Sequence, residues 1–175
     1  MRALVVAVAL SVCGCPRGAN DASGASSNGS SAAASSNACW PITPLTLEAL
    51  EHGAEWEPIA SLQADGTFVR TEGRKVIARL ANDQLMLGGD PLTCDAARTV
   101  RAGNAVKEAQ YDAQDAFVDA RTRIFVRDDG EIELTLGGEP MFDGGKRRAR
   151  VVGDVVHARR TAELLVLVTL ASARF

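Results

Sequence analysis

Apolar residues follow three different patterns along the chain, and each pattern predicts a different kind of segment. An apolar run that only Ser11 interrupts covers residues 3–12, whereas residues 18–38 contain no large apolar side chain. From residue 39 onward, short apolar segments alternate with turn residues, which is typical of a sheet of short strands. We therefore predict a single β-rich domain over residues 39–175, preceded by two segments that do not join its core.

Turn dipeptides divide the chain after Pro58 into strand-length pieces. The first of them are Asp65–Gly66, Glu72–Gly73, Asn82–Asp83 and Gly88–Gly89. Further on, Asp129–Gly130 precedes residues 131–136, where polar and apolar residues alternate with the period of a strand that has one buried face. These features predict an α+β domain that is mostly β. Its antiparallel hairpins would form a meander, as a sandwich or a partly closed barrel, with short helices.

Two sequence pieces recur within this domain. "LMLGGDPL" (85–92) matches "LTLGGEPM" (134–141), and "ARLANDQL" (78–85) matches "ARVVGDVV" (149–156) more weakly. The order of the matched pieces differs between the two halves. We therefore interpret them as a recurrent hairpin unit rather than as a duplicated domain.

The segment after Cys39 has the signals of a short helix. Thr43 or Thr46 can cap its beginning and Gly53 can end it, so that Leu47 and Leu50 would face the core.

A second helix is predicted over residues 104–120, where apolar residues fall near helical spacing. Its opposite side would carry an acidic stripe made of Glu108, Asp112, Asp115 and Asp119. This stripe lacks the ligand spacing and glycine of a calcium loop, so we interpret it as a solvated helix face. The alternative is that "DAFVDA" (115–120) is a strand that leads into the next hairpin.

The C-terminal segment is apolar on every side over residues 164–168. Its β-branched residues favour a buried strand, whereas the sequence Thr-Ala-Glu from Thr161 favours a capped helix. Of the two, we favour a helix packed on the sheet.

The N-terminus resembles the signal peptide of bacterial lipoproteins. Arg2 precedes an apolar run that is about ten residues long, half of the roughly 20 residues that a membrane-spanning helix needs. The run ends in Val12-Cys13-Gly14-Cys15, which is similar to a lipobox with a small residue before the modified cysteine. Placing that cysteine at Cys13 instead would put Val12 in the small-residue position, so Cys15 fits better.

This resemblance implies that residues 1–14 are a signal peptide and that Cys15 carries the lipid. Residues 15–38 would then be the lipidated cysteine and a flexible Ser/Ala/Gly linker, since 17 of the 21 residues from 18 to 38 are Gly, Ala or Ser. The membrane would be a partner through the lipid anchor. Because Pro16 rather than Asp follows the cysteine, the outer membrane of the bacterial cell envelope is favoured over the inner membrane.

Two cysteines remain in the folded part after such processing. Cys39 and Cys94 form an even pair in an oxidising compartment, so we predict a disulfide between them. The alternatives are two free buried thiols or a catalytic cysteine.

Composition narrows the chemistry further. The chain has 175 residues and a net charge of −3, which argues against nucleic-acid binding. Its two histidines, His52 and His157, lie far apart, and no cofactor or metal motif is present, so none is predicted.

One basic cluster is a candidate anion-binding patch. It consists of Lys146, Arg147, Arg148 and Arg150. The alternative is that these side chains form the charged outer face of a strand and protect a sheet edge from aggregation.

Taken together, these features predict a membrane-anchored envelope lipoprotein whose β-rich domain is a non-enzymatic binding or structural module. Its partners would be other envelope proteins or an anionic polymer. An envelope hydrolase that uses carboxylates in a cleft is one alternative function, and a binder of anionic envelope polymer through the basic cluster is another.

Overall fold

The computed structural model describes residues 38–51, 55–87, 91–103, 108–142 and 147–172. The expected signal peptide, Cys15, the Gly88–Gly89 turn and Lys146 lie outside these residues.

The described residues form a long antiparallel meander followed by one helix. The strands are β1 (Leu45–Glu51), β2 (Glu57–Leu62), β3 (Thr67–Arg70), β4 (Lys75–Ala81), β5 (Gln84–Met86), β6 (Leu92–Cys94), β7 (Thr99–Ala102), β8 (Ala109–Tyr111), β9 (Phe117–Val118), β10 (Thr122–Val126), β11 (Ile132–Leu136), β12 (Glu139–Pro140) and β13 (Arg147–Gly153). The 3-10 turn η1 (Glu72–Arg74) joins β3 to β4, and the helix α1 (Val155–Ser172) follows β13.

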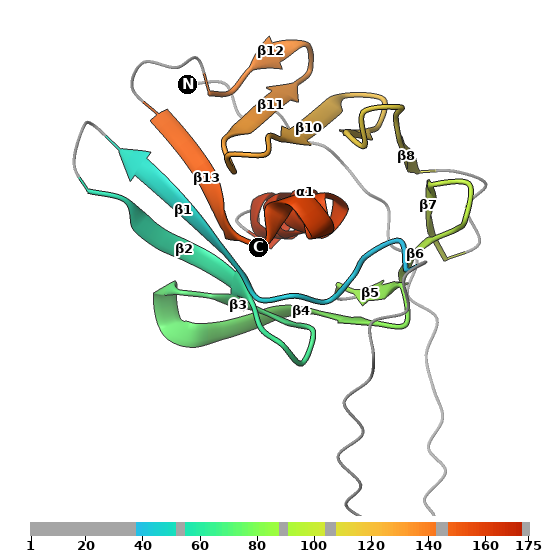
Figure 1. The fold of residues 1–175 in the computed structure, drawn as a ribbon, viewed down its shortest axis with the longest axis horizontal. Helices are drawn as coiled ribbons and strands as arrows, with labels where there is room; N and C mark the ends of the chain where they lie inside the picture. Colours follow the sequence, from blue (N-terminus) through green and yellow to red (C-terminus); the bar gives the residue numbers. More distant parts are fainter. Residues whose placement is uncertain (1–37, 52–54, 88–90, 104–107, 143–146, 173–175) are drawn as a thin grey trace, which may run out of the picture. The chain divides into compact units, whose positions relative to one another are not determined.

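Each strand from β1 to β12 pairs with the next, and β13 returns to pair with β1 (Figure 1). In this last pair, Leu45 lies opposite Gly153 and Glu51 opposite Arg147. The two ends of the sheet are therefore β12 and β13. The predicted mostly antiparallel meander is confirmed, and the sheet does not close into a barrel.

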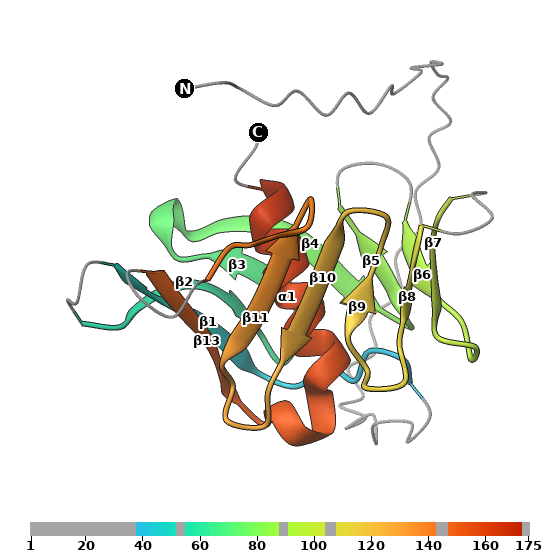
Figure 2. The same cartoon turned by 90° about the horizontal axis from the view of Figure 1, so that it is seen from above.

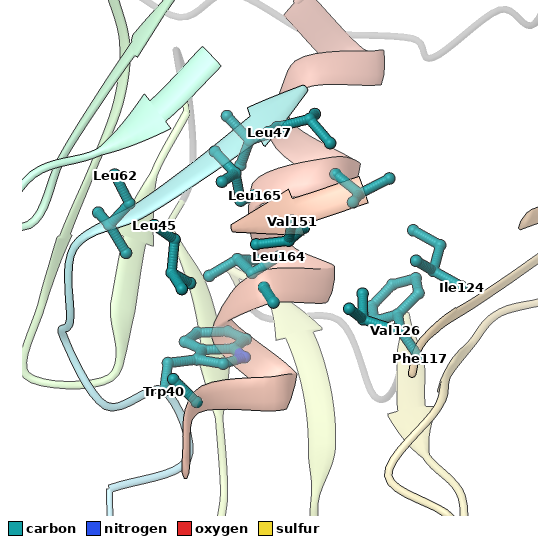
Figure 3. Packing of buried hydrophobic residues seen from close by; sticks show 14 of the residues in the cluster. Trp40, Leu45, Leu47, Leu62, Phe117, Ile124, Val126, Val151, Leu164 and Leu165 are labelled. Carbon is teal, nitrogen blue, oxygen red and sulfur yellow. The ribbon is translucent and has the colours of Figure 1, made fainter. Parts of the chain in front are cut away.

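The helix α1 lies against the inner face of this curved sheet. Seen from two directions, it lies between β1–β4 on one side and β10–β11 on the other (Figures 1 and 2). Leu164 and Leu165 are fully buried between Leu45 and Leu62 on one side and Ile124 on the other (Figure 3). An apolar run without a polar face suits a helix that a sheet surrounds. The favoured C-terminal helix is thus present, although it begins at Val155 rather than at Thr161.

The segment predicted as a helix ending at Gly53 is strand β1 instead, so that prediction was wrong. Leu45 and Leu47 are buried, while Thr46 between them and Glu48 after them are partly exposed. The period of the segment is therefore two. Pairing with both β2 and β13 satisfies its backbone on two sides, which outweighs the helix propensity of Leu, Glu and Ala.

The helix predicted over residues 104–120 is also wrong, because the described part of this segment forms β8 and β9. Two acids of the supposed stripe, Asp112 and Asp119, stabilise turns. Asp112 Oδ1 accepts the N–H groups of Gln114 and Ala116, and Asp119 Oδ1 accepts that of Thr122. Local bonds of this kind compete with a helix. The alternative, a strand within "DAFVDA", corresponds to β9.

Two glycine turns hold neighbouring strands in the same way. At Gly66 (φ +81°) and Gly130 (φ +84°), an added Cβ would lie 2.1 Å from the carbonyl oxygen of Leu80 and Val151, respectively. The N–H groups of Leu80 and Val151 donate to the carbonyls of these glycines, each at 2.8 Å. At both sites only glycine tolerates the positive φ and the close approach together.

The recurrent sequence pieces correspond to these shared features. Leu80 and Val151 occupy equivalent places in the weaker match, and the bond from Val151 to Gly130 draws β13 toward β11. In the stronger match, Leu85 pairs with Leu92, and at the equivalent place Met141 N–H donates to Leu134. The repeat is therefore a recurrent hairpin with a common register.

Candidate functional site

The start of the folded domain is fixed to the sheet by a disulfide. Cys39 is bonded to Cys94 on β6, with Cα atoms 6.0 Å apart, which is a usual separation for a disulfide. This bond is consistent with the pairing expected from the cysteine count.

Hydrogen bonds fix the adjacent residues to the first turns of α1. Trp40 is buried, and its Nε1–H donates to the hydroxyl of Tyr111 at 2.7 Å. That hydroxyl donates to the Arg160 carbonyl at 3.3 Å, and the Thr161 hydroxyl donates to the Pro41 carbonyl at 2.8 Å. Burial raises the pKa of Tyr111 above its ordinary value, so this group stays a neutral donor. In this corner of the domain, the side chains of Trp40, Tyr111 and Thr161 therefore all have hydrogen-bond partners.

Next to this corner lies a pocket of about 770 Å³. It is lined by residues at the start of the folded domain, in the β4–β5 and β6–β7 turns and in the β8–β9 loop. The N-terminal residues of α1 complete the lining. Its lining includes the disulfide and seven ionisable side chains: Asp83, Asp95, Arg98, Asp115, His157, Arg159 and Arg160.

One carboxylate binds two of these arginines. Asp115 Oδ1 accepts from Arg98 Nη1 at 2.9 Å, and from Nε and Nη2 of Arg160 at 3.1 and 2.9 Å. The Arg160 guanidinium also lies over the Tyr111 ring, 5.7 Å from its centroid. The guanidinium groups come from the β6–β7 turn and from α1 and meet at a loop, which is why their sequence positions do not indicate their proximity.

The third arginine, Arg159, is only partly paired. Its Nη2 contacts Asp128, whose side chain is 75% exposed, and its guanidinium lies 5.3 Å from the centroid of Phe125. Its Nε is buried and has no hydrogen-bond partner among the described residues. Such a donor is unusual in a folded protein and needs an explanation.

The other two acids have structural roles. Asp83 Oδ1 accepts the Trp40 N–H at 2.9 Å. Asp95 Oδ1 accepts the Thr99 N–H at 2.9 Å, and Asp95 also pairs with Arg101. The Thr99 N–H and, after it, Arg101 lower the pKa of Asp95. Asp95 is therefore suited to remain ionised rather than to act as a general acid.

The carboxyl group with a raised pKa lies elsewhere. Glu163, on α1, is fully buried, and its oxygens accept the N–H groups of Phe117 and Val126 at 3.0 and 3.2 Å. Burial raises its pKa to about 9, although both N–H donors and Arg159 act in the opposite direction. Glu163 connects the helix to β9 and β10 inside the core. Sequence reasoning missed this residue, and its one signal was a single acid at the start of an apolar run.

No known protein family, curated protein or solved structure matches this chain. The pocket therefore has to be interpreted from its own chemistry.

Of the predicted basic cluster, Arg147, Arg148 and Arg150 lie on β13, and none of these three lines the pocket. Arg148 pairs with Glu131, and Arg150 pairs with Glu48 at 2.8 Å. Both guanidiniums also lie over the ring of Trp56, with Arg150 4.3 Å from its centroid. Lys146 and the side chain of Arg147 lie outside the described residues. The charges of the two described arginines are thus largely compensated within the sheet, as expected for a protected edge strand.

Metal-ligand geometry and helix length also bear on function. Within the described parts of the chain, no cluster of His, Cys, Asp or Glu is arranged to hold a metal ion. His157, whose side chain is 82% exposed, contacts Asp154 at 2.8 Å, and His52 is outside the described residues. None of the described helical residues forms a helix long and apolar enough to cross a membrane.

Proposed function

We propose that this protein is a lipoprotein of the bacterial cell envelope, anchored through Cys15, whose β-rich domain is a non-enzymatic binding or structural module. The linker of residues 15–38 would hold the domain close to the membrane surface. The proposal combines the lipobox-like residues of the N-terminus with the architecture of the domain.

The Cys39–Cys94 disulfide is the observation that carries the assignment to the envelope. Disulfides persist in the periplasm and on cell surfaces, whereas cytosolic reductants keep thiols reduced. This bond also lies directly after the expected linker, where it fixes the point at which a membrane tether would join the domain.

The arrangement of α1 supports a module that recognises partners on its surface. In many curved sheets the inner face encloses a ligand. Here Leu164, Leu165 and Val168 of α1 fill that face and are fully buried. Recognition would then occur at the outer surface or in the charged pocket beside the disulfide.

The intact mass of the protein purified from a bacterial membrane fraction tests the anchor. We expect a chain without residues 1–14 whose mass is raised by acyl chains and which gains two hydrogens on reduction. Cys15→Ala should abolish acylation and leave the protein in the soluble fraction, while Cys13→Ala should still be lipidated. Acylation that survives in Cys15→Ala, or a fully reduced wild-type protein, would contradict the proposal.

Membrane separation on a density gradient tests the destination. With Pro16 after the cysteine, we expect the wild-type protein in the outer membrane of a Gram-negative host. Pro16→Asp should redirect it to the inner membrane, while Pro16→Ser should not. An unchanged distribution for Pro16→Asp would contradict this part of the proposal.

A further inference from the structure

We propose that the charged pocket beside the Cys39–Cys94 disulfide binds a phosphate group. Arg98, Arg159 and Arg160 line this pocket of about 770 Å³, which is within the range of small-ligand sites. The inference deepens the proposed binding role and rests on it, but it does not depend on the lipid anchor.

The first observation is the excess of guanidinium around Asp115. Arg98 and Arg160 share this single carboxylate, and three of their N–H donors converge on the same atom, Oδ1. A guanidinium group has five N–H donors in a planar fork. Two guanidinium groups together can therefore bind further oxygen atoms besides those of one carboxylate. The group around Asp115 therefore keeps a positive charge and unused donors at the pocket wall.

The second observation is the incomplete pairing of Arg159. Its Nε is buried without a partner among the described residues, and its Nη2 contacts the strongly exposed Asp128. An exposed ion pair contributes little to stability. Both contacts of its guanidinium, Asp128 and the Phe125 ring, lie outside the pocket lining, so Arg159 would contribute positive charge near a bound oxyanion rather than a direct hydrogen bond.

The helix adds to the same positive potential. Ala158 has non-helical dihedral angles (φ −130°, ψ 32°), so regular helix begins at the two arginines that follow it. The first turn of α1 has no acidic residue. Arginines at a helix N-terminus add to the positive end of the helix dipole, which favours a bound anion nearby.

Phosphate fits this arrangement better than a carboxylate does. A carboxylate has two oxygens, whereas a phosphate offers three or more to the unused donors of Arg98 and Arg160. The phosphate could belong to a soluble phosphoester or to a lipid headgroup. Since Ala38 also lines the pocket, an anchored chain would carry the pocket directly beside its membrane tether.

Titration calorimetry and phosphorus NMR on the full chain in detergent micelles test the proposal. One series uses inorganic phosphate, and a parallel series uses micelles doped with a short-chain phosphatidylglycerol. Arg98→Gln removes a pocket arginine. Arg148→Gln is its matched control, because the two side chains are 43% and 44% exposed and each pairs with one carboxylate.

We expect saturable binding that Arg98→Gln and Arg160→Gln each weaken at least tenfold, while Arg148→Gln changes it less than twofold. Arginine-dependent binding of free phosphate would identify a soluble source, and such binding of the doped micelles alone would identify a headgroup. If neither probe binds, or if Arg148→Gln weakens binding as much as Arg98→Gln does, the proposal is overturned. Thermal unfolding of each variant identifies any loss of binding that is due to misfolding. The anchor is tested separately by intact mass.

Discussion

Two carboxyl groups that join α1 to its surroundings, Glu163 and Asp115, are used in opposite ways. Glu163 projects from the helix into the core, is fully buried and binds two backbone N–H groups. Asp115 lies on a loop, has a side chain that is 34% exposed and binds two arginines of the pocket. Glu163 is shielded from water and binds neutral backbone N–H groups, whereas Asp115 is partly hydrated and binds positively charged guanidinium groups.

This difference shows where the domain obtains stability and where it can bind a partner. A buried carboxyl group with neutral partners is favoured in its protonated form, so it serves as a fixed structural group. A half-exposed carboxylate between guanidiniums contributes little to stability, but it positions charges that a ligand can use. Substitutions at these positions and the pH dependence of stability can separate these two roles.

The largest effect should come from removing the covalent bond beside the pocket. Replacing Cys39 and Cys94 together by alanine frees a separation of 55 residues, for which the chain-entropy model predicts a loss of about 4 kcal/mol. The free energy of unfolding from urea titration measures it. A decrease of less than about 1 kcal/mol in the free energy of unfolding would mean that the hydrogen bonds of Trp40 and Thr161 are sufficient to hold the start of the folded domain in place.

The next largest effect should come from the core carboxyl group. Glu163→Leu removes the acceptors of two buried N–H groups, each of which costs about 1–3 kcal/mol when it is left without a partner. We expect a loss of about 3 kcal/mol, again from urea titration. Glu163→Gln keeps one acceptor oxygen and should lose about half as much. Equal stability of Glu163→Leu and the wild type would show that packing alone positions the helix.

The pH dependence of stability should separate the two carboxyl groups further. Because the pKa of Glu163 rises from 4.5 to about 9 on folding, its contribution is complete below the lower value and is lost as the pH rises toward the upper one. We expect the wild type to lose roughly 3 kcal/mol relative to Glu163→Gln between pH 6 and 8, since each of these two pH units corresponds to about 1.4 kcal/mol. Parallel urea midpoints for the two proteins over this range would contradict the raised pKa.

The smallest effect should come from the pocket carboxylate. Asp115→Asn should cost about 1 kcal/mol or less, because its partners are half-exposed. Asp128→Asn serves as the control for a more exposed acid and should be nearly neutral. A thermal unfolding midpoint that falls as far for Asp115→Asn as for Glu163→Leu would mean that the pocket is part of the structural core.

The sequence predicted the sheet better than it predicted the site. The turns at Gly66 and Gly130 were recognisable because Asp-Gly dipeptides interrupt apolar runs, and the strand after Gly130 alternates with a period of two. The strand β1 was missed because Leu, Glu and Ala also favour helices, and its second partner, β13, is distant in sequence. Pairing over such a distance leaves no local signal.

The pocket could not be predicted for the same reason. Arg98, Asp115 and Arg160 belong to separate elements, and only the curvature of the sheet around α1 brings them together. The acids near Asp115 were interpreted as one helix face because the spacing of apolar residues suggested a helix. Their actual roles in turns follow from backbone N–H groups that a sequence does not show.

The pairing of β1 with β13 also determines the order in which the domain can be completed. Leu45 and Gly153 are opposite each other in this pair but more than 100 residues apart along the chain. During synthesis the early strands leave the ribosome first, so β1 exposes an unpaired edge until the last strand arrives. An open edge of this kind invites intermolecular pairing. We therefore expect chains truncated before Arg147 to aggregate, even though β2–β12 keep their neighbours.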